Sequence, residues 1–298
     1  MAEYKAPLRD MRFVLTELFD YNDINQMPGC EDFTPDVVDA VLEEAAKVCE
    51  EVLYPINRSG DEEGCHWDDG VVTTPKGFKE AYKTFAEGGW TGIACDPTYG
   101  GQGAPKSINA LVEEIICSSN LSFGMYPGLS FGAYAALHSH ASDALKDKFL
   151  PKMVEGTWAG TMCLTEPHCG TDLGIVKSKA DPLDDGSYAI SGTKIFISAG
   201  EHDLTENIIH LVLAKLPDAP KGTKGISLFL VPKFMVGDDG SLGDRNAVKC
   251  GSIEHKMGIK ASSTCVMNFD GAVGYLVGEP HQGMPAMFTM MNQERLSV

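Results

Sequence analysis

The chain has 298 residues, of which 24 are lysine or arginine and 42 are aspartate or glutamate, so its formal net charge is −18. Hydrophobic residues make up 43% and charged residues 22%, which is typical of a globular protein and excludes a disordered or collagen-like chain. Because a field of this sign repels phosphate, neither nucleic acid nor an anionic membrane is expected as a general partner.

The first half of the chain has the spacing of amphipathic helices. Thr34 followed by Pro35 predicts a helix start, because threonine caps well and proline suits the first turn. Apolar residues then recur at helical spacing, and we expect Pro55 and Gly60 to end this helix. Further helices are predicted over about 75–87 with Gly88-Gly89 as C-cap, over about 106–116, and across about 130–154, where Pro151 and Gly156 break the pattern.

The middle of the chain changes to short apolar segments separated by turn residues, such as Asp184-Asp185-Gly186 and Ser191-Gly192. Strands are predicted over 158–165, 188–190, 194–197, 208–214, 226–231 and 265–269. Several strands punctuated in this way favour an antiparallel β-barrel or sandwich. From about Pro285 the pattern turns helical again and stops at Val298 without a cap, so we expect an incomplete chain.

These elements predict an α+β multidomain architecture. It consists of an N-terminal α-helical domain, a middle antiparallel β-barrel or sandwich domain, and the start of a C-terminal helical bundle. The expected boundaries are 1–30 for an N-terminal extension, 31–158 for the helical domain, 159–280 for the β domain and 281–298 for the beginning of the last domain.

Cysteine and histidine give no sign of a metal or disulfide framework. The nine cysteines include no Cys-x-x-Cys pair, and we expect reduced thiols packed as small core residues. Glu201-His202-Asp203 offers ligand types, but we expect it in an exposed loop. Residues 1–10 lack the apolar core of a signal peptide, and no stretch approaches the roughly 20 apolar residues of a membrane span. We therefore expect a cytoplasmic protein without a bound metal.

Four motifs occur together in one order. They are Gly89-Trp90-Thr91-Gly92-Ile93-Ala94-Cys95-Asp96-Pro97-Thr98-Tyr99-Gly100-Gly101-Gln102-Gly103, Met162-Cys163-Leu164-Thr165-Glu166-Pro167-His168-Cys169-Gly170-Thr171-Asp172, Gly192-Thr193-Lys194-Ile195-Phe196-Ile197-Ser198-Ala199-Gly200, and His255-Lys256-Met257-Gly258-Ile259-Lys260-Ala261-Ser262-Ser263-Thr264. In this order and spacing, over about residues 30–298, they resemble the acyl-CoA dehydrogenase family. Residues 4–11 are similar to the N-terminal extension of a long subgroup, which includes 3-methylmercaptopropionyl-CoA dehydrogenase-like proteins.

The resemblance implies an FAD site in the β domain. The implied cofactor contacts are Met162, Leu164, Thr165, Gly170, Thr171, Phe196, Ile197 and Ser198. Backbone N–H groups and the hydroxyl at Leu164-Thr165 are donors that can stabilise negative charge on the pyrimidine edge of a flavin. The family more often has serine at 171, tryptophan at 196 and threonine at 198, so this chain keeps a hydroxyl or an aromatic ring at each departure.

Each of these segments also has an ordinary structural interpretation. The end of the strand at Thr165 is also explained by a threonine that caps a turn. Gly170-Thr171-Asp172 is also explained by an Asx-type turn. The segment 195–198 is equally explained by a half-buried hairpin strand, with Ile195 and Ile197 on one face and Phe196 and Ser198 on the other.

The family's reaction needs a carboxylate base in an apolar cleft, because burial raises a carboxyl pKa to a useful value. Glu294, just before Arg295, matches the base position of some branches; the alternatives are a base beyond residue 298 or a surface role for Glu294. Thr171, Asn292 and Arg295 match positions that contact acyl-CoA. The acyl pocket is expected near Phe123, Tyr126, Leu129 and Phe131, and Glu113-Glu114 is expected at a solvated helix edge.

The predicted activity is FAD-dependent dehydrogenation of an acyl-CoA thioester at its α,β bond to a trans-2-enoyl-CoA. The resemblance implies that electrons pass to an electron-transfer flavoprotein and that the protein is a homodimer or homotetramer. Alternatives are an acyl-CoA oxidase or flavin monooxygenase on the same fold, a DNA-associated flavoprotein of the same family, and an inactive chain that only folds or dimerises. The charge of −18 argues against DNA binding by this segment.

Overall fold

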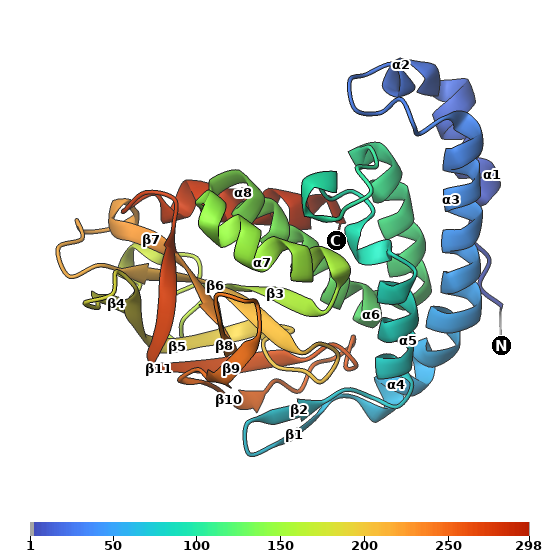
Figure 1. Ribbon diagram of the computed structural model, residues 1–298. Coiled ribbons are helices and arrows are strands. Elements are labelled where there is room, and N and C mark those ends of the chain that lie inside the picture. Colours follow the sequence, from blue (N-terminus) through green and yellow to red (C-terminus); the bar gives the residue numbers. More distant parts are fainter. Residues whose placement is uncertain (1–2, 298) are drawn as a thin grey trace.

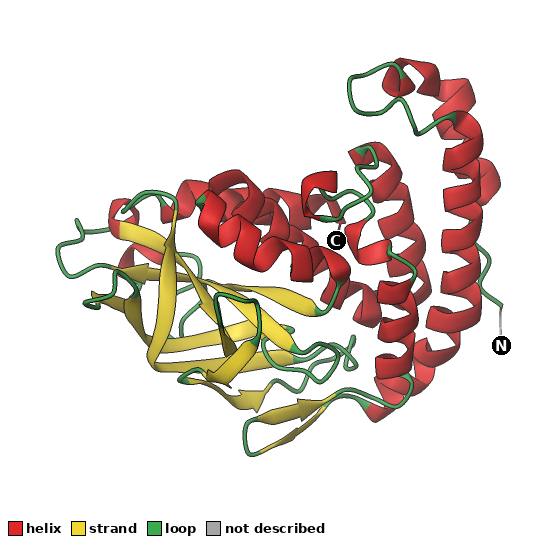
Figure 2. Cartoon of the chain, viewed as in Figure 1, coloured by secondary structure: helices red, strands yellow, loops and turns green. Residues whose placement is uncertain are grey.

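A computed structural model describes residues 3–297, and it begins with a helical region. This region contains α1 (Leu8–Phe13), α2 (Tyr21–Asn25), α3 (Pro35–Val48), α4 (Asn57–Glu63), the short strands β1 (His66–Asp68) and β2 (Val71–Thr73), α5 (Phe78–Glu87), α6 (Lys106–His140) and α7 (Asp143–Glu155). Figure 1 shows α3, α4, α5 and α6 grouped on one side of the molecule, with α1 and α2 beside α3. The separation of helices from strands is plain in Figure 2.

The helix that opens at Thr34 is longer than predicted. The Thr34 hydroxyl accepts a hydrogen bond from the Val37 amide, which confirms the cap. After Val48 the chain continues through a π-helical turn (Cys49–Leu53) and a 3₁₀ turn (Tyr54–Ile56) into α4. Pro55 lies in the first turn of the 3₁₀ segment, where its missing N–H costs little, so the prediction that it ends the helix is wrong.

Gly60 is likewise inside the helix, which ends instead at Gly64 with φ +72°. A Cβ atom at Gly60 would lie 2.5 Å from Cε2 of Phe78, so close packing against α5 requires this glycine.

Helix α6 joins two predicted helices across a kink at Asn120, where φ is −156° and ψ is 86°. The Asn120 side chain replaces the lost helical hydrogen bonds, because it accepts from the Phe123 amide at 3.0 Å and donates to the Leu53 carbonyl at 3.0 Å. Helix α7 also passes through a predicted break at Pro151 and ends at Gly156, with φ +82°. Buried side chains of α7, including Phe149 and Met153, offset the bond that proline removes.

The second region is built on a seven-stranded sheet. Its strands are β3 (Trp158–Cys163), β4 (Lys179–Pro182), β5 (Tyr188–Ser198), β6 (Asn207–Lys215), β7 (Ile226–Pro232), β10 (Val248–Ile253) and β11 (Thr264–Val277), and β8 (Phe234–Val236) pairs separately with β9 (Leu242–Arg245). The strands β11, β5, β4, β6 and β7 pair in a closed circuit, because β7 pairs with both β6 and β11. The barrel is mostly antiparallel, with β3 and β4 running parallel to β6.

Strand β5 runs without interruption through the predicted turn at Ser191-Gly192. Gly192 has φ +148°, and a Cβ atom there would lie 2.4 Å from Ser178 Oγ. The glycine is therefore needed for close approach of the segment before β4 and does not mark a turn.

Two hydrophobic cores follow from this arrangement. One fills the helical region and extends under α7 and α8 (Gly283–Ser297), and the other fills the barrel with side chains such as Ile197, Phe229 and Cys265. Helix α8 packs on α6 and β7, between the two regions (Figure 1). Within residues 3–297, none of the helices combines the length and the apolar character that a bilayer crossing requires.

Candidate active site

The end of β3 is held in place by backbone hydrogen bonds. The strand ends at Cys163, and the chain then turns back so that Glu166 and Cys169 exchange two backbone hydrogen bonds of 2.8 and 3.1 Å. The Thr165 carbonyl accepts a hydrogen bond of 2.9 Å from the Ile195 amide on β5. Two of the four sequence motifs therefore meet at this point.

A β-bulge in β5 turns Phe196 outward. Lys194 pairs with Met267 and Ile197 with Cys265, so two residues of β5 stand opposite Val266 alone. Phe196 has φ +59°, and 58% of its surface is exposed. Ile197 is 2% exposed and points into the barrel, so the expected simple alternation of this strand is wrong and only the backbone of Ile197 is open to a ligand.

The three hydroxyls that the family resemblance assigns to flavin binding are free to bond a ligand. Within residues 3–297, those of Thr165, Thr171 and Ser198 have no hydrogen-bond partner, so the expected capping role of Thr165 is not seen. A Cβ atom at Gly170 would lie 3.1 Å from Thr165 Cγ2, so glycine leaves space beside the Thr165 side chain where β3 ends. Asp172 accepts from the Gly174 amide at 2.9 Å, which confirms the Asx-type turn. Free hydroxyls beside an outward aromatic ring are a donor set that fits a flavin.

A buried ion pair that the sequence analysis missed lies under these segments. Lys194 Nζ is 2.9 Å from Glu166 Oε1 and donates to the Leu164 carbonyl at 3.1 Å. Burial alone would raise the pKa of Glu166, but the Lys194 ammonium, the Ser178 hydroxyl and the Lys177 amide lower it to about 2. No local pattern in the sequence signals this pair, because Lys194 and Glu166 lie 28 residues apart along the chain and meet only in the folded structure.

The same glutamate belongs to a cluster of metal-ligand types. One ligand atom each from Glu166, His168 and Cys169 lies within 4.8 Å of the others. The Lys194 ammonium already occupies the Glu166 carboxylate and repels a cation, so this cluster does not support a metal site.

Glu294 lies on α8 against both halves of α6. Its Oε1 atom is buried and has no hydrogen-bond partner among residues 3–297. A Cβ at Gly132 would lie 2.1 Å from that oxygen, so the glycine makes room for the carboxyl group. Burial, together with the nearby Glu113 carboxylate, raises the pKa of Glu294 to about 7.

A small, mainly apolar cavity lies between the two halves of α6, and Glu294 is not among its lining residues. Its lining includes Val112, Ile116, Phe131, Trp90 and the side chain of Glu113. Glu113 is half-buried at a cavity wall, so its expected place at a solvated edge is wrong, whereas Glu114 is exposed as expected. Cys117 also lines the cavity, and its pKa is raised to about 11 by burial and by the charges of Glu113 and Glu294.

The expected acyl-pocket residues are only partly in place. Phe131 lines the cavity, whereas Phe123, Tyr126 and Leu129 are buried in the helical core. Tyr126 instead donates to the Ala261 carbonyl at 2.9 Å and accepts from the Ser263 amide at 3.1 Å. Its role is to hold the turn before β11.

Asn292 and Arg295 are exposed on α8 and bond to one another, with Arg295 Nη1 donating to Asn292 Oδ1 at 3.0 Å. Glu201 and His202 are buried, which corrects their expected place in an exposed loop. The Glu201 carboxylate pairs there with Lys233 and, at 2.9 Å, with Arg245.

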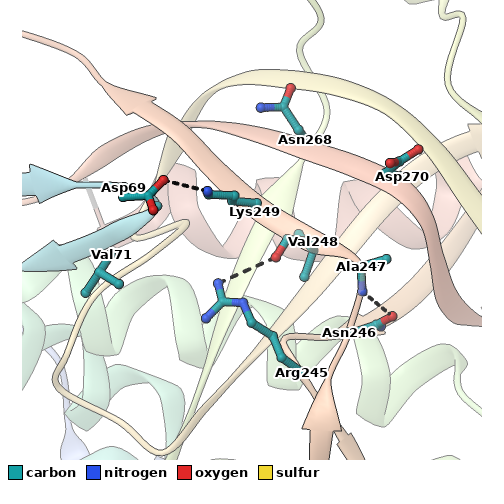
Figure 3. A pocket seen from close by; sticks show the side chains of 10 residues that line it. Asp69, Val71, Arg245, Asn246, Ala247, Val248, Lys249, Asn268 and Asp270 are labelled. Carbon is teal, nitrogen blue, oxygen red and sulfur yellow. Dashed lines mark hydrogen bonds and ion pairs between the residues drawn. The ribbon is translucent and has the colours of Figure 1, made fainter.

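A separate surface hollow contains none of the predicted site residues (Figure 3). It lies where the β1–β2 turn meets β10 and β11, and its two cations are already paired. Lys249 bonds Asp69 at 2.8 Å, and Arg245 bonds Glu201 at 2.9 Å. The hollow therefore offers no unpaired lysine or arginine among its described lining residues.

Two family models match almost the whole two-region structure. Residues 36–157 match the N-terminal domain of acyl-CoA dehydrogenases, and residues 161–272 match the middle domain. The chain belongs to the acyl-CoA dehydrogenase family. Its two matched domains correspond to the helical region and the barrel.

Several relatives are similar over nearly all of this chain. The 3-methylmercaptopropionyl-CoA dehydrogenase of Ruegeria pomeroyi is 46% identical over 295 residues, which cover 99% of the chain and 50% of that protein. A butyryl-CoA dehydrogenase of Syntrophomonas wolfei is 42% identical over 307 residues, with the same two shares. The chain thus spans about half the length of these relatives.

A solved structure has the same fold. The butyryl-CoA dehydrogenase of Megasphaera elsdenii superposes with a TM-score of 0.72 at 25% identity, covering 89% of this chain and 64% of that one.

Proposed function

We propose that this chain is the flavin-binding part of an FAD-dependent dehydrogenase, which oxidises an acyl-CoA thioester at its α,β bond to a trans-2-enoyl-CoA. The observation that carries the proposal is the corner where β3 ends beside the β5 bulge. There the unpartnered hydroxyls of Thr165 and Ser198 accompany the exposed ring of Phe196, and family membership links this corner to acyl-CoA chemistry.

In this proposal, the corner holds the flavin. Thr165 and the backbone of Leu164 would donate to its pyrimidine edge, Phe196 would cover one face, Ser198 would bond its N5 region, and Thr171 would lie near the pyrophosphate. Met162, Gly170 and the Ile197 backbone complete the contact surface. FAD supplies the two-electron acceptor for the reaction when it is bound.

Glu294 is the proposed base within this chain. Its buried Oε1 atom has no competing hydrogen bond among the described residues, and a pKa of about 7 places it near the pH at which a base both holds and releases a proton. Oε1 would accept the α-proton of the thioester. Thr171, Asn292 and Arg295 are the proposed contacts to the CoA portion, and a base beyond residue 298 is the competing assignment.

The proposed partners are an electron-transfer flavoprotein as electron acceptor and a second copy of the chain in a homo-oligomer. Family membership supports both.

An anaerobic visible-absorbance titration with acyl-CoAs of several chain lengths tests the function. We expect a bound-flavin band that bleaches with one class of acyl-CoA. A protein that holds no flavin would contradict the proposal. Bleaching followed by rapid reoxidation in air would favour an oxidase or monooxygenase.

Two variants test the residue roles in the same assay. Thr165→Ala should weaken flavin affinity about tenfold, the loss of one hydrogen bond, and Thr193→Ala is the matched control because its hydroxyl bonds Asn268 instead. Glu294→Gln should abolish bleaching while leaving the flavin bound. Full bleaching by Glu294→Gln would show that Glu294 is not the base.

A further inference from the structure

The Glu166–Lys194 pair connects the segments that the proposed flavin site uses. Both side chains are almost fully enclosed, with 3% and 0% of their surfaces exposed. The carboxylate accepts hydrogen bonds from the Ser178 hydroxyl at 2.6 Å and amide at 3.0 Å, and from the Lys177 amide at 2.8 Å. The pair thereby connects the exit of β3, the bulged strand β5 and the segment that leads into β4.

The contact of Lys194 with the Leu164 carbonyl has an electronic consequence. That carbonyl and the Thr165 N–H belong to one peptide group. An ammonium donating to the oxygen at 3.1 Å draws electron density toward it and makes the N–H at the other end a stronger donor. Enclosure strengthens this effect, because little solvent screens the charge.

The residue that carries this N–H is also fixed by a hydrogen bond of its own carbonyl, which belongs to the next peptide group. The Thr165 carbonyl accepts from the Ile195 amide at 2.9 Å, so the Thr165 residue is bonded to β5 immediately after Lys194. The donor is therefore both oriented by β5 and polarised by a side chain of β5.

We propose that Lys194, with Glu166 as its counter-ion, is a positioning residue that polarises the Leu164–Thr165 peptide and so makes the site bind reduced flavin more tightly relative to oxidised flavin. This inference rests on the proposed function, in which the Thr165 N–H meets the flavin's pyrimidine edge. Reduction increases the negative charge there, so a stronger donor favours the reduced form. Lys194 itself needs no contact with the cofactor.

The test is a double variant that removes the polarising cation together with its counter-ion, so the net charge stays the same. Lys194→Gln/Glu166→Gln replaces an ion pair, whose net charge is zero, with two uncharged amides of similar size. The measurements are the affinity for oxidised FAD by fluorescence and the midpoint potential of the bound flavin by equilibrium dye titration. We expect affinity for the reduced form to fall about tenfold more than affinity for the oxidised form, which lowers the two-electron potential by about 30 mV.

A matched control removes another charge pair. Lys249→Gln/Asp69→Asn deletes the 2.8 Å ion pair of the Figure 3 hollow, and we expect the potential of the parent protein. Lys194→Arg retains the cation and should restore most of the lost potential. Lys194→Gln alone, in which Glu166 can become neutral by taking up a proton, should shift the potential in the same direction as the double variant.

Equal losses of affinity for both oxidation states, or an unchanged or higher potential, would overturn the inference and make the pair a structural clamp. The same conclusion follows if neither Lys194 variant folds or holds flavin. A parent protein that binds no FAD would remove the proposed function as well, so the two failures are distinguishable.

Discussion

Glu294→Gln replaces a buried carboxyl group by an amide of the same shape, and the structure predicts its effect on stability as a function of pH. The ordinary carboxyl pKa is 4.5, and burial beside Glu113 raises that of Glu294 to about 7. Between pH 4.5 and about pH 7, Glu294 therefore holds a proton in the folded protein but has lost it in the unfolded chain. Stability from this group is present in full below 4.5 and is lost as the pH rises through about 7.

The size of the loss follows from the two pKa values. Compared with a carboxyl group whose pKa stays at 4.5, Glu294 lowers the free energy of unfolding by about 1 kcal/mol at pH 5 and by about 3 kcal/mol at pH 8. Glu294→Gln cannot ionise, so it avoids this cost. We expect the variant to gain about 2 kcal/mol of stability relative to the parent between pH 5 and pH 8.

Urea unfolding of both proteins at pH 5, 6, 7 and 8 measures this difference, and other titrating groups cancel in the comparison. Glu114→Gln, at an exposed position of α6, is the matched control and should follow the parent at every pH. Parallel pH profiles for the parent and Glu294→Gln would refute the reasoning, because they would mean that the carboxyl group is hydrated.

Three further variants test the packing around the site. Gly132→Ala places a methyl group 2.1 Å from Glu294 Oε1 and should push the carboxyl group toward solvent, so the same urea series should show a smaller pH dependence than the parent; an unchanged dependence would contradict this placement. Gly128→Ala, one turn earlier on α6 with no atom within 4 Å of the new Cβ, should instead raise stability by about 0.5–1 kcal/mol, and a loss would show that this wall is tighter than described. Tyr126→Phe leaves the buried Ser263 amide without its acceptor and should lower the free energy of unfolding by about 1–3 kcal/mol in denaturant titration, whereas an effect near zero would indicate that water replaces the hydroxyl.

The local chemistry of the sequence predicted those features that depend on neighbours along the chain. Thr34 caps a helix, Gly156 ends one, and the apolar segment from Trp158 stops where the strand does. The residues of the proposed flavin site were chosen from motifs, since their spacing within one loop or strand is a property of the sequence. The strands β3, β5, β6, β7 and β11 were predicted individually, whereas β4, β10 and the pairings that close the circuit were not.

Features set by distant partners could not be predicted in this way. Gly60 and Gly192 resemble breaks in the sequence, yet each is needed because a side chain from another segment packs against it. The bulge at Phe196 depends on the register with β11, and the partnership of Lys194 with Glu166 depends on that same register. Glu201 has the polarity of a surface residue. Its pairing with Lys233 and Arg245 offsets the free-energy cost of burying its charge.

The kink at Asn120 makes the shape of the apolar cavity depend on the angle between the two halves of α6. Glu113 and Cys117 lie on the segment before the kink, and Gly128 and Phe131 lie on the segment after it. The two segments therefore form walls of the same cavity. At the kink, the Asn120 side chain donates a hydrogen bond to the Leu53 carbonyl. A shift of the helical turn that carries Leu53 would therefore change the width of the cavity without touching any residue that lines it.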